Sequence, residues 1–241
     1  MKGLYFRDFD FYCLKFETVT FALSMRQLSR RAEYHQDRLV QCIKDPVLIN
    51  LYEDAYGRDG DSKLDFWTRA GILEKVIDPE LSAMLQAIRS QFDVFSQVIN
   101  SELFESPKDA RNLAVAFKKI GTRIESEKLK KKIYEIIDHE NFIYIDDFIN
   151  LSKHVVTLAT RYWQENNEGF KITKNFTTMS WNGEDKVMNN LEFVPEKKLE
   201  WVVNTLKPWA DQQLYMIGTI LKEIQKDMMD ESELEWDISL L

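Results

Sequence analysis

The residues best suited to do chemistry together lie between residues 142 and 163, a segment with neither Gly nor Pro. Asn150 and His154 are four residues apart, so both side chains are expected on the same face of a helix. His154 could act as a general acid or base, and Asn150 could orient it or a substrate. The other candidates in this segment are Lys153 for catalysis and Asp147 and Arg161 for binding. The same residue types also form polar seams inside helical bundles. On residue types alone, a structural seam is favoured over a catalytic site.

A second polar row lies in the earlier segment at residues 81–104. Asp93, Gln97 and Asn100 follow one another at spacings of four and three residues, which places them on one helical face. These side chains could hydrogen-bond to Asn150 and His154, either as a structural seam or as a ligand-recognition centre. The chain has only three histidines, so we do not expect a multi-histidine metal site. The sequence has no Gly-rich phosphate loop, and we expect no cofactor.

Three further patterns have weaker chemical meaning. Arg30 and His35 have the R-x4-H spacing of a nuclease signature, but His35 is in phase with an apolar stripe, which favours a core histidine or an accidental match. The segment around Asp59 and Asp61 resembles a calcium loop but lacks the first Asp, the sixth-position Gly and the closing Glu. Residues 128–132 hold four lysines, which indicate a solvated helix face or a contact with an acidic partner.

The composition predicts a cytoplasmic protein with a real core. Hydrophobic residues make up 44% of the 241 residues, unlike a disordered chain. The net charge of −8 opposes general attraction to phosphates and therefore disfavours RNA as a partner. Two cysteines without C-x-x-C spacing indicate a reduced compartment. We expect no membrane contact, since no signal-peptide pattern and no apolar run of about 18–20 residues is visible.

The positions of apolar residues, caps and prolines predict a mostly helical chain. The predicted helices span residues 14–43, 46–56, 63–76, 78–104, 106–120, 123–138, 141–166 and 195–229. Asp78 and Pro79 mark a helix start, whereas the last helix keeps its apolar stripe in phase through Pro208, where a kink is predicted. Alternating residues around Asn182-Gly183 predict a small β-hairpin within residues 168–194.

These elements together predict an all-α fold, an up-and-down bundle of long amphipathic helices with the β-hairpin as an insertion. No Pro/Ser-rich linker divides the chain. Residues 1–230 are therefore predicted to form a single domain, followed by an acidic C-terminal tail at residues 231–241.

Two short motifs resemble segments of bacterial HEPN-like proteins. The residues that carry the resemblance are Phe92, Asp93, Gln97, Ile99 and Asn100 in the first motif and Tyr144, Phe148, Asn150, Lys153 and His154 in the second. The resemblance covers residues 81–229 and includes the hairpin followed by a last long helix. It implies an up-and-down α-bundle that is often a dimer. Active members are metal-independent ribonucleases, commonly toxins or parts of defence systems, whose Arg and His meet at a dimer cleft and cleave RNA through its 2′-hydroxyl.

The chain departs from that family pattern at one position that matters for catalysis. Asn150 precedes His154 by four residues, where the family has an Arg at five or slightly more, and Arg161 follows the histidine. Without that cation, the charge on the phosphate in the transition state is poorly stabilised. We therefore expect a HEPN-like binding or regulatory component without catalysis, in stress or phage defence, that acts as a homodimer or with a protein partner.

Two alternatives stay open at this point. The chain could be a toxin-type, metal-independent ribonuclease in which His154 transfers the proton, assisted by Lys153 or Arg161. It could also be an interaction module that docks on a partner through the apolar residues of its tail, between Trp236 and Leu241.

Overall fold

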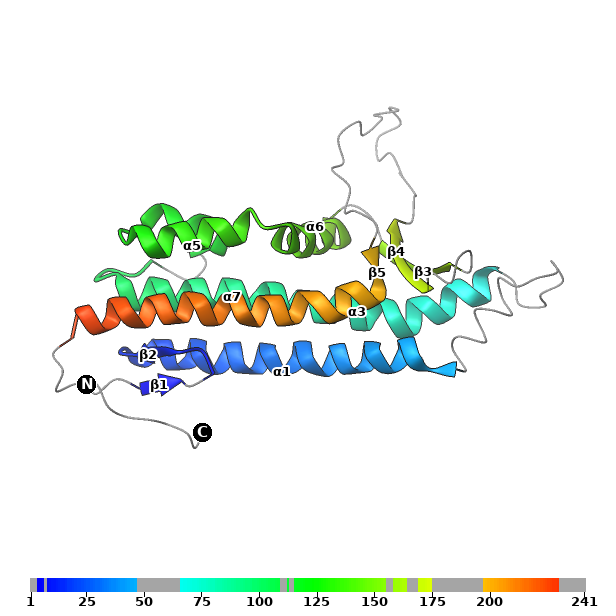
Figure 1. Ribbon diagram of the computed structural model, residues 1–241, viewed down its shortest axis with the longest axis horizontal. Helices are drawn as coiled ribbons and strands as arrows, with labels where there is room; N and C mark the ends of the chain where they lie inside the picture. Colours follow the sequence, from blue (N-terminus) through cyan, green and yellow to red (C-terminus); the bar gives the residue numbers. More distant parts are fainter. Residues whose placement is uncertain are drawn as a thin grey trace, which may run out of the picture. The chain divides into compact units, whose positions relative to one another are not determined.

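The structure is a computed structural model. It describes residues 4–6, 8–46, 66–108, 112, 115–154, 158–163, 169–174 and 197–229, with side chains for residues 8–46, 75–108, 112, 115–150 and 197–229. The helices are α1 (Phe16–Lys44), α3 (Phe66–Leu103), α4 (Phe117–Ile120), α5 (Glu127–Ile137), α6 (Glu140–His154) and α7 (Leu199–Asp227), with a 3-10 turn η2 (Gly121–Arg123). Figure 1 colours them in chain order. The predicted all-α bundle with a small β insertion is confirmed.

The chain divides into two compact units, each described by itself. Unit 1 comprises Met1–Arg31, Ala87–Ile143 and Lys207–Leu241, and unit 2 comprises Ala32–Gln86 and Tyr144–Leu206. The single domain expected over residues 1–230 stays a prediction.

The longest helices agree with the apolar periodicity of the sequence. Helix α1 covers the segment predicted at residues 14–43, and α7 is one helix that passes through Pro208, as predicted. Helix α3 differs, since it continues through Pro79, where a new helix was predicted to start. Ile77 and Leu81 are both buried on either side of that proline. Packing of these residues offsets the hydrogen bond that a proline inside a helix removes.

Two predicted helices are wrong in part, and a third lies outside the described residues. In the helix predicted at residues 106–120, the described residues 106–108 and 112 are non-helical, and its last turn is present as α4. The helix predicted at residues 141–166 ends at His154. The short helix predicted at residues 46–56 falls almost wholly outside the described residues.

A three-stranded sheet replaces the end of the predicted helix at 141–166. Strand β3 (Leu158–Trp163) pairs antiparallel with β4 (Gly169–Lys174), and β4 pairs with β5 (Lys197–Lys198). The residues after His154 are rich in Val, Thr and aromatic types, which suit a strand better than a helix. The strand predicted around residues 170–173 is thus confirmed with β3 as its partner, whereas the Asn182-Gly183 turn lies outside the described residues.

An N-terminal hairpin was not predicted. Strands β1 (Leu4–Phe6) and β2 (Phe11–Cys13) pair antiparallel, and Asp10 in the turn between them has a left-handed φ of 52°. This turn lies against α7 at Gly218, where an added Cβ would meet the carbonyl oxygen of Phe9 at 1.9 Å. The small size of Gly218 therefore allows the hairpin to approach the helix.

Aromatic residues form the centre of unit 1. The ring of Phe92 lies 5.0 Å from Phe117, 5.3 Å from Phe142 and 6.0 Å from Trp209. The cluster fastens α4 and the start of α6 to α3, because edge-to-face and tilted aromatic pairs add to the free energy gained from burial.

Unit 2 has its own core, to which α6 contributes Tyr144 and α7 contributes several apolar side chains. Tyr144 packs edge-on to Trp201 at 6.0 Å, and Val202, Val203 and Leu206 of α7 are fully buried. Gln36 of α1 donates its side-chain N–H to the carbonyl oxygen of Val203 at 2.6 Å. Helices α1 and α7 are thus tied together within this unit.

Candidate functional site

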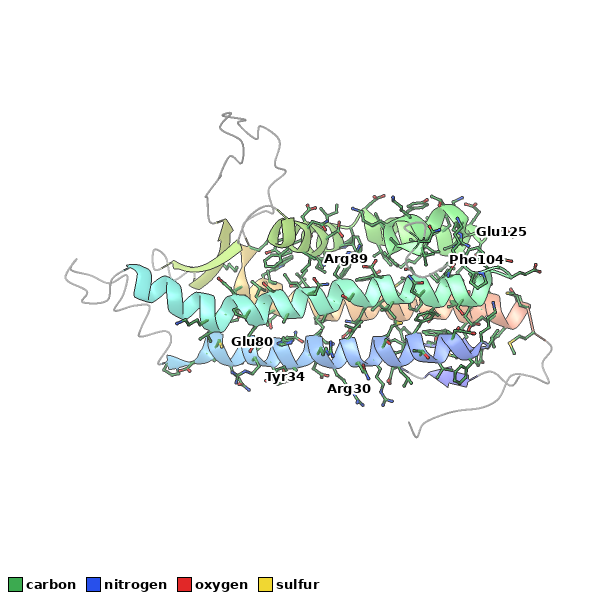
Figure 2. The ribbon with its side chains drawn as sticks, turned by 180° about the vertical axis from the view of Figure 1, so that it is seen from behind. Arg30, Tyr34, Glu80, Arg89, Phe104 and Glu125 are labelled. Carbon is green, nitrogen blue, oxygen red and sulfur yellow. The ribbon has the colours of Figure 1, made fainter. Side chains whose placement is uncertain are left out.

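Two residues of the polar row predicted on α3, Asp93 and Asn100, are engaged by their own chain. Asp93 forms an ion pair with Arg89, whose Nη1 lies 2.7 Å from Asp93 Oδ1. It also accepts a hydrogen bond from the backbone N–H of Phe117 at 3.4 Å. The guanidinium of Arg89 also lies 5.2 Å from the ring centre of Phe142. Arg89 is labelled in Figure 2, on α3. Asp93 therefore positions the start of α4.

Asn100 holds the segment that connects α3 to α5. Its Oδ1 accepts hydrogen bonds from Arg123 Nη1 at 2.7 Å and from the backbone N–H of Lys108 at 3.2 Å. Its Nδ2 donates to the carbonyl oxygen of Lys108 at 2.9 Å. Arg123 in turn lies over the ring of Phe104 at 4.1 Å. Asn100 is 4% exposed, so this buried amide acts as a structural tie.

The predicted row on α6 is only partly described. Asn150 is exposed and donates to Asp146 Oδ2 at 3.1 Å, one turn earlier in the helix. Asp147 is half-buried, and Lys153 and His154 occupy the last turn of α6, with side chains outside the described residues.

Arg161 is not on this helix, contrary to the prediction. It lies on β3, opposite Lys171 of β4, because the helix ends seven residues earlier at His154. The helical row that was to join Asn150, His154 and Arg161 is therefore broken. Asp93, Gln97 and Asn100 belong to unit 1, whereas Asn150 and His154 belong to unit 2, so the meeting of the two rows stays a prediction.

A histidine–carboxylate pair is present in unit 2 where the sequence predicted a core histidine. His35 Nδ1 lies 2.6 Å from Glu80 Oε2, and Arg38 Nε lies 3.7 Å from the other oxygen of Glu80. The side chain of His35 is 25% exposed and the ring of Tyr34 stands edge-on to it at 5.2 Å. Tyr34 and Glu80 are labelled in Figure 2, on α1 and α3 respectively. His35 is thus a partly exposed member of an ion-paired group and not a core residue.

The His35–Glu80 pair could move a proton, since a carboxylate at Nδ1 orients the imidazole and leaves Nε2 for a reacting group. The His35–Glu80 pair could not be predicted from the sequence, because the two residues are 45 positions apart. Glu80 also follows Pro79, where a helix start was predicted. Arg30, the other half of the R-x4-H spacing, is exposed and belongs to unit 1.

A buried carboxylate in unit 1 was also missed. Glu102 is 4% exposed and accepts from the backbone N–H groups of Leu14 at 3.1 Å and Lys15 at 3.2 Å. Gln225 Nε2 donates to its other oxygen at 3.2 Å, and the Gln225 side chain bonds both the N–H and the carbonyl of Tyr12. This clasp joins α3, α7 and the end of β2.

Burial changes the acidity of two groups in the clasp. Loss of solvation raises the pKa of the Glu102 carboxyl. Hydrogen bonds from Thr18, Lys15, Leu14 and Gln225 lower this pKa but do not cancel the effect of burial. Burial also raises the pKa of the Cys13 thiol well above its usual range, and the charge of Glu102 raises it further. Cys13 is therefore an unreactive thiol, and the clasp has the character of a structural joint.

Within the described residues, no three His, Cys, Asp or Glu side chains are grouped so as to hold a metal ion. None of the helices in that part of the chain has the length and apolarity needed to cross a membrane. Comparison of the chain with protein families, curated proteins and solved structures gave no match.

Proposed function

We propose that this chain is a HEPN-like binding or regulatory component without catalytic activity, which works in stress or phage defence as a homodimer or with a protein partner. The observation that supports the absence of catalysis is the use made of the α3 row. Asp93 accepts a hydrogen bond from the backbone of Phe117 and is ion-paired with Arg89, while Asn100 is hydrogen-bonded to Lys108 and Arg123.

The position of Arg161 supports the same proposal. A metal-independent ribonuclease needs a cation that stabilises the phosphate in the transition state. Arg161 was the arginine available near His154 in the sequence, and it lies on a strand beyond the end of α6. The second candidate function, a ribonuclease that uses His154, would then depend on Lys153 for this charge.

Cleavage of RNA tests the proposal. Purified wild-type chain is incubated with a mixed-sequence RNA without divalent metal, beside His154→Ala, and the same genes are expressed to score growth arrest. His35→Ala serves as a third protein because His35 has an oriented imidazole on another helix. Far-UV circular dichroism verifies that each variant is folded. We expect no cleavage above the background for any of the three proteins.

Two results would reject the proposal. Cleavage by the wild type that disappears in folded His154→Ala would establish the ribonuclease alternative. Cleavage that disappears only in His35→Ala would place catalysis at the His35–Glu80 pair. The third candidate function, docking through the tail, predicts instead that deletion of residues 230–241 abolishes capture of a protein partner.

A further inference from the structure

A basic surface lies on unit 1 of this acidic chain. Residues 115–137, which form α4, η2 and α5, contain seven Lys and Arg against three Glu. The exposed lysines of α4 and α5, here called the lysine surface, are Lys118, Lys119, Lys128 and Lys131. The side chain of Lys131 is 80% exposed and that of Lys128 is 63% exposed. Such a surface attracts a negatively charged group at short range.

The last turns of α7 lie directly beside this surface. Lys128 in the first turn of α5 bonds to Glu223, which is four residues before the end of α7 at Asp227. Figure 1 shows α5 and the last part of α7, coloured red, side by side. The chain that follows α7 therefore begins next to the lysine surface.

The segment that follows α7 has the complementary charge. Residues 230–241 lie outside the described residues and contain five Asp and Glu and no Lys or Arg. Their acidic positions come first, at residues 230–237, nearest to the end of α7. Twelve extended residues span up to about 40 Å, whereas the eleven residues of α5 rise only about 16 Å. The acidic segment is therefore long enough to follow the lysine surface from end to end.

We propose that residues 230–241 dock on the lysine surface of their own chain and cover it. Single ion pairs at an exposed surface are individually weak. Here the acidic segment is tethered within a few residues of the surface, which gives it a high effective concentration there. Nucleic acid is a poorer occupant, because the net charge of −8 opposes a polyanion that is not tethered to the chain.

Docking of this kind blocks access of other molecules to the lysine surface. An acidic partner protein would have to displace residues 230–241 before it could contact Lys119 and Lys131. This inference does not depend on the absence of catalysis, and its test measures the position of the segment without measuring RNA cleavage.

The test places a nitroxide spin label on the full-length chain at Ser239→Cys. Cys13 and Cys42 are buried, so the introduced thiol is the reactive one. We expect slow label rotation at low salt and a several-fold faster rotation at about 1 M salt, where the screening length falls to about 3 Å. We expect the same release at low salt in Lys119→Glu/Lys131→Glu.

Matched controls separate this contact from general effects of charge. Lys75→Glu/Lys198→Glu changes two exposed lysines of unit 2 and should leave the label slow. Glu231→Gln/Glu233→Gln/Glu235→Gln should release it, because the acidic partners are neutralised. Dilution should have no effect on label rotation if the contact is within one chain.

Three results would overturn the proposal. A label that already rotates rapidly in the wild-type background at low salt shows that the segment is undocked. A slow label that ignores the Lys119→Glu/Lys131→Glu change shows that the segment binds elsewhere. Release on dilution shows that the occupant of the lysine surface is a second copy of the chain.

Discussion

At the scale of single residues, the polar groups of unit 1 differ sharply in how well they are satisfied. Asn100 and Gln225 each make several hydrogen bonds while buried. Gln91 is 1% exposed, and neither its amide nitrogen nor its amide oxygen has a hydrogen-bond partner among the described residues. An unsatisfied buried polar group costs stability that an apolar side chain of the same shape would recover.

The direction in which replacement of Gln91 changes the free energy of unfolding can therefore be predicted. Gln91→Met keeps the length of the side chain and removes both unsatisfied groups, so we expect the free energy of unfolding to rise by about 1–3 kcal/mol. Urea unfolding measures this change. Gln225→Met is the matched control, and it should lower the free energy of unfolding because three hydrogen bonds are lost. A less stable Gln91→Met protein would mean that the amide is satisfied after all.

The buried Glu102 predicts how stability depends on pH. Burial raises the pKa of its carboxyl in the folded chain, so the folded state holds the proton more tightly than the unfolded state. This contribution to stability is present below the unfolded pKa, taken as 4.5, and is lost as the pH rises through the raised, folded value. The free energy of unfolding of the wild type should therefore decline with pH over this window more steeply than that of Glu102→Gln.

Unfolding in urea at a series of pH values measures that slope, with Glu105→Gln as the control because Glu105 is exposed nearby. Equal slopes for the wild type and Glu102→Gln would show that the hydrogen bonds from Leu14, Lys15 and Gln225 outweigh the effect of burial.

At the scale of the elements, the N-terminal hairpin depends on the shape of α7. Asp10 in its turn accepts hydrogen bonds from Thr219 Oγ1 and Lys222 Nζ, both at 2.8 Å. Gly218 lies one residue before Thr219, and its missing side chain leaves room for the backbone of Phe9. The hairpin and the helix are thus fitted to each other by one glycine and one aspartate.

Gly218→Ala should destabilise the chain, although alanine favours a helix more than glycine does. The added Cβ would meet a backbone oxygen at 1.9 Å, so we expect a loss of about 1–3 kcal/mol. Gly121→Ala is the control, since its added Cβ would meet the Tyr134 side chain at 3.1 Å, where a small shift suffices. Thermal unfolding compares the two variants, and an unchanged melting temperature for Gly218→Ala would show that the hairpin is not docked there.

Pro79 distinguishes the observed α3 from the helix start that the sequence predicted. In the interior of a helix a proline costs about 3 kcal/mol relative to alanine, whereas at the first turn its cost is small. Pro79→Ala should therefore raise the free energy of unfolding by up to that amount, as measured by urea unfolding. A neutral or destabilising effect would favour a helix that starts at Pro79.

The elements also show where sequence reasoning succeeds and where it stops. Helices α1 and α7 could be predicted because an apolar stripe that keeps the helical period over many turns fits only a helix. The helix predicted over residues 158–163 is wrong, because their apolar residues fit a helical period while their Thr and aromatic types suit a strand. The Glu102–Gln225 contact spans 123 residues and leaves no local pattern from which it could be predicted.

At the scale of the whole molecule, the chemistry-bearing residues are distributed over two units. The α3 row and the Glu102 clasp belong to unit 1, whereas the His35–Glu80 pair and the α6 row belong to unit 2. In unit 1 Asp93, Asn100 and Glu102 join segments of the chain to one another. This use of polar residues, together with the displaced Arg161, is the basis for proposing a binding or regulatory component and not a ribonuclease.

The rate of RNA cleavage tests that claim most directly. With the wild-type chain in large excess over a fluorescently labelled RNA and without divalent metal, a single-turnover experiment detects even slow chemistry. We predict a cleavage rate equal to that of His154→Ala and of RNA alone. A wild-type rate well above both, from protein of the same purity and fold, would contradict the account.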